Sequence, residues 1–261
     1  MSRVMSAAAV AAVLMASSAY AQTPQGPQAP ATQAGAPSSD YNEKFFLGVS
    51  AGGLMNTTLV TSKATSTVYN QEAALAERRD VSGGVLADVT VGMPIRGRLA
   101  VGASVAFRSA TSDSAISATI PHPLFFGAPR TVSTSTTGMQ ETQAWLGVLA
   151  MYTLPTSSKL TLRVFGGPAV AVVNHDVVGS FTVTEGTSIT QPTVNITKGS
   201  VSKSFIGAMA GIDLSYNVTK SVGIGAFVRY AGAQANVTGA ESGTLGGLEA
   251  GGGLRFSFAK K

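Results

Sequence analysis

The sequence of 261 residues contains no cysteine, and only 12% of its residues are charged. Without cysteine there is no disulfide framework, no thiolate metal site and no lipid-modified cysteine. Soluble domains usually carry about 25% charged residues, so half that share, with a positive mean hydropathy of +0.25, indicates contact with a membrane. Beyond the N-terminus, however, no run of about 18 apolar residues could form a spanning helix. A membrane crossing would therefore have to use β-strands.

Signals for several function classes are also missing. The Arg78-Arg79 pair stands alone beside Glu77 and Asp80, so there is no basic block of the kind that binds nucleic acid. The sequence contains no P-loop, no dinucleotide fingerprint, no EF-hand and no HExxH motif. We therefore expect neither a cofactor nor a metal, and no nucleic-acid partner.

The N-terminus has the pattern of an export signal. Arg3 precedes an apolar stretch from Val4 to Met15, and Ala19-Tyr20-Ala21 supplies the small residues of a signal peptidase site. We predict a signal peptide over 1–21, cleaved after Ala21. Residues 22–43 are rich in Pro, Gln and Ala with few large apolar side chains, which predicts a flexible periplasmic linker before a barrel domain over 44–261.

From Phe45 onward, apolar and polar residues alternate with period two in eight segments, which predicts eight β-strands. Their approximate spans are 44–54, 83–95, 98–108, 139–154, 159–173, 203–216, 221–231 and 246–258. Short connections alternate with long polar stretches at 55–82, 109–138, 174–202 and 232–245. An even strand number with alternating short and long connections is typical of transmembrane barrels. The fold expected is all-β: a single antiparallel eight-stranded up-and-down barrel with short periplasmic turns and long extracellular loops.

The two faces of these segments differ in a way that orients the barrel. One face is apolar and carries no charge, as in Val85, Ala87 and Val89, which suits contact with hydrocarbon. The other face holds Gly, Ser and Thr together with charged residues that we assign to the lumen: Lys44, Asp88, Arg108, Glu141, Arg163, Asp213, Arg229, Glu249 and Arg255. Since a buried charge needs a partner, we expect pairs on adjacent strands: Arg108 with Glu141, Arg229 with Glu249, and Arg163 with Asp213.

Aromatic residues fall on the apolar face near the ends of the segments, where they predict two interfacial girdles. The short-turn end has Phe45, Tyr152, Tyr216, Phe256 and Phe258, and the long-loop end has Phe107 and Tyr230. Trp145 falls inward. Gly166-Gly167-Pro168 lies inside a predicted strand, and we expect a bulge or a change of face there because proline cannot donate to a ladder.

The two histidines are the first candidates for a general base in a hydrolase. His122 stands between two prolines, and His175 precedes Asp176, with Ser180 nearby. Adjacent residues on an extended chain point to opposite sides, and no oxyanion donor is identifiable. We therefore interpret these residues as polar loop positions and expect no catalytic residue.

The signal peptide, the strand Leu47–Gly53, the strand Gln143–Ala150 and the aromatic end Arg255–Phe258 together resemble the small eight-stranded outer-membrane β-barrels of the OmpA, OmpX and opacity type. The resemblance implies a bacterial outer-membrane protein without catalysis, whose loops serve envelope integrity, adhesion or environmental contact. It implies outer-membrane lipid and lipopolysaccharide, the barrel assembly machinery and an extracellular partner of the loops as partners. Two alternatives stay open: a small ion or solute channel and, more remotely, a lipid hydrolase.

Overall fold

The computed structural model describes residues 43–55, 58–81, 83–157, 159–186, 192–235 and 243–259. The predicted cleavage site at Ala19 and Ala21 and the linker as far as residue 42 lie outside these ranges. The regular elements in them are ten strands: β1 (Glu43–Leu54), β2 (Thr58–Val68), β3 (Gln71–Val81), β4 (Val85–Arg96), β5 (Leu99–Ile120), β6 (Arg130–Leu154), β7 (Leu160–Thr184), β8 (Thr193–Asn217), β9 (Val222–Ala235) and β10 (Gly243–Ala259). In the described part of the chain, no helix is long and apolar enough to cross a membrane.

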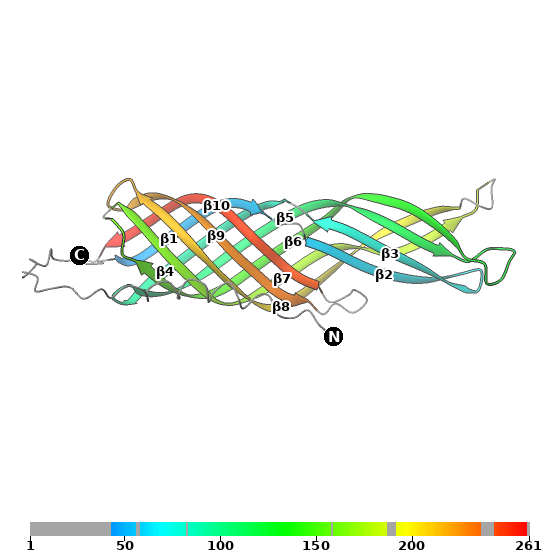
Figure 1. Ribbon diagram of the computed structural model, residues 1–261, viewed down its shortest axis with the longest axis horizontal. Coiled ribbons are helices and arrows are strands. Elements are labelled where there is room, and N and C mark those ends of the chain that lie inside the picture. Colours follow the sequence, from blue (N-terminus) through cyan, green and yellow to red (C-terminus); the bar gives the residue numbers. More distant parts are fainter. Residues whose placement is uncertain are drawn as a thin grey trace, which may run out of the picture. The chain divides into compact units, whose positions relative to one another are not determined.

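Eight of the strands form a closed ring in the order β5-β4-β1-β10-β9-β8-β7-β6, with β6 paired back to β5 (Figure 1). All neighbours are antiparallel, and the chain enters and leaves the ring through the pair β1 and β10. The eight predicted segments correspond in order to these eight strands. The predicted eight-stranded antiparallel barrel is confirmed.

The long connections are far more regular than expected. The stretch 55–82, predicted as a loop, contains the hairpin β2–β3, whose inner strand pairs with the outer half of β5. Its two-residue turn, Tyr69-Asn70, has positive φ at both positions, as in type I′ hairpins. Most of 109–138 and 174–202 is also strand, because β5 to β8 continue well past the ring. We call β2, β3 and the outer parts of β5 to β8 the extension.

Within the extension the sheet divides between β6 and β7. Their pairing runs from the short-turn end only to Glu141 and His175, whereas β5–β6 and β7–β8 stay paired up to Ile120 and Thr184. A four-stranded sheet and a two-stranded ribbon result. They share a second apolar core, made of Ala73, Leu75, Ile116, Ala118, Ile120, Val178, Phe181 and Val194.

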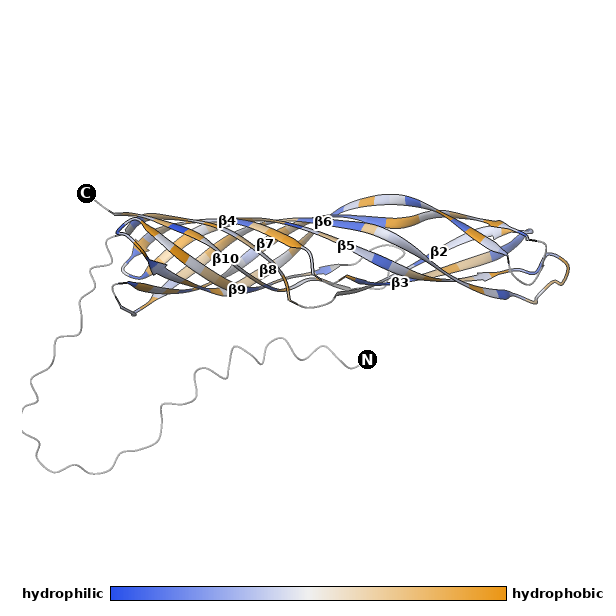
Figure 2. Ribbon diagram, turned by 90° about the horizontal axis from the view of Figure 1, so that it is seen from above, coloured by the Kyte–Doolittle hydropathy of each residue, from blue (hydrophilic) through white to orange (hydrophobic). Residues whose placement is uncertain are grey.

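Strand β5 shows why these stretches were predicted as loops. In the ring its outward residues are apolar, as in Val101 and Phe107, but in the extension its outward residues include Ser117 and Thr119 while Ile116 and Ile120 are buried inside. The apolar stripe therefore passes from the outer face to the inner face along one strand, and Figure 2 shows the changing hydropathy along the strands. A face in water has no need to be apolar, so the Ser/Thr-rich outer half resembled a loop.

The expectation of a bulge or face change at Gly166-Gly167-Pro168 is wrong. Pairing of β7 with β8 continues through Pro168 opposite Ala208 without a shift, and the register with β6 is the same before and after this site. Only the β6 pairs of Gly167 and Pro168 are missing, so the ladder tolerates the absent proline donor locally. A Cβ on Gly167 would lie 2.0 Å from the Val148 carbonyl oxygen, so glycine permits this close approach to β6.

Candidate functional site

The outer surface of the ring carries the apolar belt that the sequence predicted. None of the residues assigned to the lipid face is buried, and large side chains on it such as Leu146, Val148 and Ile224 are more than half exposed. Exposed apolar surface of this extent on a closed ring needs a non-aqueous surrounding. The ring is therefore the part of the chain that crosses the membrane.

The aromatic residues assigned to the girdles lie on this same outer surface. Phe45, Tyr152, Tyr216 and Phe258 are exposed at the short-turn end, and the rings of Phe45 and Phe258 contact each other with centroids 5.7 Å apart. Phe256 is partly exposed between them. Phe107 and Tyr230 are exposed at the opposite end of the belt. We propose that the two sets mark the two membrane–water interfaces.

The interior of the ring holds a linked set of charges. Arg108 Nη2 lies 3.4 Å from Glu141 Oε1, and Arg229 Nε lies 2.7 Å from Glu249 Oε2, so the structure brings both expected pairs together. Arg229 also reaches across the ring to Asp88, with 2.5 Å between Nη1 and Oδ2. Ser104 Oγ donates a second hydrogen bond to Asp88 at 2.9 Å. These residues are almost fully buried, so each charge depends on its partners rather than on water.

The third expected pair is arranged differently. Arg163 and Asp213 are direct cross-strand neighbours, but the Asp213 carboxylate accepts hydrogen bonds from Arg255, which lies two strands away on β10. The guanidinium of Arg163 stacks on the ring of Phe46, 4.1 Å from its centroid. Lys44, also assigned to the lumen, has an exposed side chain at the start of β1. It lies within the register shift between Glu43 and Phe45 at the end of the ring, so its assignment to the lumen stays a prediction.

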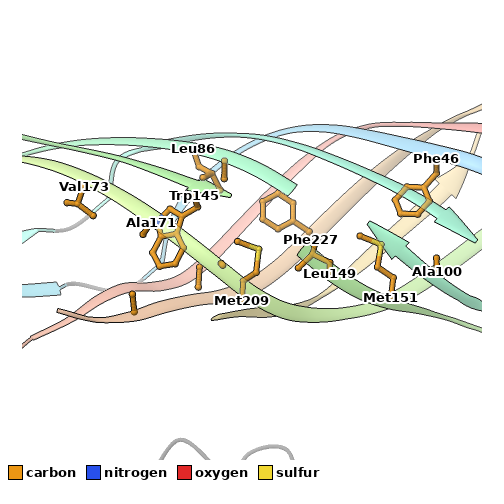
Figure 3. Packing of buried hydrophobic residues seen from close by; sticks show 14 residues of the cluster. Phe46, Leu86, Ala100, Trp145, Leu149, Met151, Ala171, Val173, Met209 and Phe227 are labelled. Carbon is orange, nitrogen blue, oxygen red and sulfur yellow. The ribbon is translucent and has the colours of Figure 1, made fainter. Parts of the chain in front are cut away.

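Large apolar side chains fill the space between these charges, which the sequence analysis missed. Figure 3 shows Trp145, Leu149, Met209 and Phe227 packed together inside the ring, and all four are at most 5% exposed. Trp145, predicted to point inward, does so and donates its Nε1 hydrogen to Gln143 Oε1. The alternation of each strand carried the missed signal, because these residues share the inward parity of the charged ones. The lumen is thus packed with side chains.

A small cavity of about 30 Å³ remains toward the short-turn end, lined by Phe46, Ser50, Asp88, Arg163 and Arg255 among others. A buried water needs roughly 10–15 Å³ measured in this way, so the cavity has room for two or three waters. It lies inside the charge network and beside the packed apolar residues. Such a space can hydrate the arginines, but it is not an open path through the ring.

The extension has a buried polar group of its own. Glu77 accepts hydrogen bonds from Ser62 Oγ and Ser114 Oγ at 2.6 and 2.8 Å, and Arg79 donates to the carbonyl oxygen of Asp176. From the sequence, Glu77 and Arg79 were expected in a long polar loop. Both are buried because β3 alternates strictly between buried and exposed positions.

A second polar group lies at the outer end of the extension. Arg130 donates hydrogen bonds to both carboxylate oxygens of Glu185, at 2.9 and 2.7 Å, and Tyr69 donates a third at 2.7 Å. These hydrogen bonds, those from Arg130 above all, lower the pKa of Glu185 to about 2. The group joins the β2–β3 turn, the start of β6 and the segment after β7.

The two histidines are not arranged for nucleophilic catalysis. His122 Nδ1 accepts hydrogen bonds from the backbone amides of Leu124 and Phe125, so it organises its own loop. Asp176 accepts a hydrogen bond from the Gln140 amide instead of orienting His175. Ser180 lies beyond the register shift at Gly179. The described residues here thus lack the nucleophile–base–orienter geometry of a catalytic triad.

No protein-family model matches the chain, and no curated protein matches it. Among solved structures it is similar to neisserial surface protein A, with 17% identity, 82% of this chain and 97% of that chain covered, and a TM-score of 0.41. It is also similar to the outer membrane protein OprG from Pseudomonas aeruginosa (9% identity, 84% and 97% covered, TM-score 0.44) and to the outer membrane protease OmpT from Escherichia coli (8%, 84% and 98%, 0.47). These are likenesses of fold alone.

The geometry of the ring indicates the class of membrane protein to which the chain belongs. Eight antiparallel strands close without a free edge, the outward belt is apolar and free of charge, and the charges lie inside. A spanning structure in lipid must satisfy all its backbone groups internally, which a closed ring does. Antiparallel rings of even strand number with such a belt are typical of outer membranes. The chain is an outer-membrane β-barrel protein.

Proposed function

We propose that this protein is a non-enzymatic surface protein, in which the ring anchors the chain and the extension contacts other surfaces. The observation that carries the proposal is the second apolar core, which joins β3 and β5 to β7 and β8 outside the membrane belt. Simple loops would need no core of their own. A packed extension supports a role in presenting a defined surface at a distance from the membrane.

The lumen favours this role over that of a channel. Eight-stranded barrels are usually filled by side chains, whereas open pores need about 16 strands. Here Trp145, Met209 and Phe227 occupy the interior, and Arg229 joins β9 to β4 across it. Both features oppose a continuous path for water.

Orientation is tested with single cysteines, since the chain has none of its own. Ser117→Cys lies on the outer face of the extension, and Lys220→Cys lies in the short connection between β8 and β9; both positions are exposed. On intact cells a membrane-impermeant maleimide should label only Ser117→Cys, and permeabilisation should add labelling at Lys220→Cys. The reverse pattern would place the extension in the periplasm and overturn the proposal.

The role itself is tested in two further ways. Cells that display the protein should bind to immobilised cells or to each other more than cells without it. The purified protein, refolded into a planar bilayer and checked for folding by its gel mobility before and after boiling, should give no steady conductance. Stable conductance steps would support the channel instead. Unchanged cell contact would contradict the surface role.

Lipid and lipopolysaccharide around the belt, and the barrel assembly machinery during biogenesis, are the remaining partners we propose. The belt and its aromatic residues support the first, because they present only apolar and interfacial side chains to the surroundings. The aromatic end of β10, with Phe256 and Phe258, supports the second.

A further inference from the structure

The loop between β5 and β6, Pro121 to Pro129, exposes an unusual group of side chains. Leu124, Phe125 and Phe126 are 69%, 63% and 90% exposed, although they lie outside the membrane belt. Beyond the last ring pair, Val85 with Ser109, strand β5 runs on through 11 residues to Ile120, which corresponds to roughly 36 Å of strand. Three consecutive large apolar residues at the end of a water-exposed extension need a partner.

Several backbone groups of this loop need no hydrogen bond from water. His122 Nδ1 accepts hydrogen bonds from the amides of Leu124 and Phe125, at 3.1 and 3.2 Å. Pro121, Pro123 and Pro129 have no amide hydrogen at all. Arg130 Nη2 donates to the Pro121 carbonyl oxygen at 2.9 Å. The bonds to His122 and the prolines thus reduce the number of loop amides that would need water, which lowers the cost of bringing Leu124 and Phe125 into an apolar surrounding.

The loop is also tied at its base and carries no carboxylate, lysine or arginine. Arg130, at its end, is bound to Glu185, and Glu185 accepts a hydrogen bond from Tyr69 on the neighbouring hairpin. The ring of Phe125 packs against His122, with centroids 4.8 Å apart. Leu124 and Phe126 are exposed, and the loop itself contributes no charged side chain that burial would have to desolvate.

We propose that the tip formed by Leu124, Phe125 and Phe126 inserts into the surface of a lipid bilayer other than the one that holds the ring. Aromatic and leucine side chains are those that enter the interface of a bilayer. An apolar pocket on a protein could also receive the three side chains, but protein interfaces surround such a pocket with a polar rim, and the loop has no charged side chain with which to pair with one. The inference rests on the proposed function, because the extension must face away from the cell.

The test uses the whole protein refolded into lipid nanodiscs, so that the belt is already covered. Phosphatidylcholine vesicles with brominated acyl chains are then added to the variant Phe126→Trp. Trp145 is buried in the ring and serves as an internal reference. We expect the added tryptophan to shift its emission to the blue and to be quenched by the brominated lipid, and we expect the nanodiscs to float with the vesicles.

The double variant Phe125→Ser/Phe126→Ser should bind vesicles more weakly by on the order of 100-fold, because two aromatic side chains no longer enter the interface. Val218→Ser, at a 62% exposed position in the short connection at the opposite end, is the matched control and should bind like the parent. Phe125, Phe126 and Val218 are all exposed, so the substitutions should leave folding unaffected. Gel mobility before and after boiling checks this.

Absence of flotation and quenching would overturn the inference, and so would equal binding by the double variant and the parent. Pairing of nanodiscs in the absence of vesicles, lost in the double variant, would identify a second copy of the chain as the occupant instead. The maleimide experiment is independent of these results. Surface labelling without vesicle binding would overturn this inference alone, whereas failed labelling would overturn the proposed function.

Discussion

Arg229 and Glu249 are direct cross-strand neighbours on β9 and β10, and their charged groups meet at 2.7 Å in the interior of the ring. The same guanidinium binds Asp88 on β4, three strands away in the ring, so a single arginine is shared between two carboxylates. Removing it leaves both carboxylates buried.

Arg229→Ala should therefore destabilise the barrel by about 3–5 kcal/mol, the usual cost of breaking a buried pair from one side. Adding Glu249→Gln should recover part of the loss, because it removes one of the carboxylates then in excess, although Arg108 still lies 3.7 Å from Glu249. Urea unfolding in lipid, followed by Trp145 fluorescence, measures both variants and the single Glu249→Gln. Strictly additive effects would show that the two side chains are not coupled.

The outward face of β5 is apolar in the ring and polar in the extension, so an outward-facing arginine should have different effects on stability in the two parts of the strand. Val101→Arg places a charge on the lipid belt and should destabilise the folded barrel by about 2–4 kcal/mol. Ser117→Arg lies on the outward face of the extension and should change stability little. The fraction of protein that resists unfolding in detergent gels reports both. Equal losses would mean that the membrane boundary on β5 is misplaced.

Two adjacent glycines on β7 should differ in their tolerance of alanine. A Cβ on Gly167 would meet the Val148 carbonyl oxygen at 2.0 Å, whereas one on Gly166 would meet nothing closer than 3.5 Å. Gly167→Ala should cost about 1–3 kcal/mol through displaced backbone, and Gly166→Ala should be close to neutral. Urea midpoints of the two variants decide the matter, and a tolerated Gly167→Ala would disprove the close approach.

The group at the outer end of the extension should respond to acid. Because the pKa of Glu185 is lowered to about 2, its hydrogen bonds stabilise the tip above pH 4.5, and this stabilisation is lost as the pH falls toward 2. Pepsin cleavage near Phe125 should be slower in the parent than in Glu185→Gln at pH 4, and the two rates should converge near pH 2. Glu72→Gln, at an exposed position of the same hairpin, is the control. A constant difference across this range would contradict the assignment.

Sequence reasoning placed the ring correctly because lipid imposes a strict rule on one face. Every second residue of β4 or β9 must be apolar, and this pattern is visible without a structure. The hairpin β2–β3 and the outer half of β5 obey no such rule, since their outer faces meet water and their inner faces are lined partly by alanine and serine. Periodicity in Ser, Thr and Ala is too weak to separate strand from loop.

The interior was predicted only where partners sit on adjacent strands. Arg108 with Glu141 and Arg229 with Glu249 could be paired from strand order. The contacts of Arg255 with Asp213 and of Arg229 with Asp88 cross the lumen between strands that are not neighbours. Such contacts depend on the width of the ring and on side-chain length, which a strand pattern does not contain.

The crossing of the apolar stripe along β5 also fixes how deeply the barrel sits. If the ring shifted by two residues toward the extracellular side of the membrane, Phe107 would move into water. If it shifted by two residues toward the periplasm, Ser109 and Thr111 would enter the hydrocarbon. Both displacements are unfavourable, so the chain sets its own vertical position, and a thicker bilayer would have to thin locally or tilt the ring. The height at which Phe126 stands above the membrane is thus determined by the number of residues that separate it from Phe107.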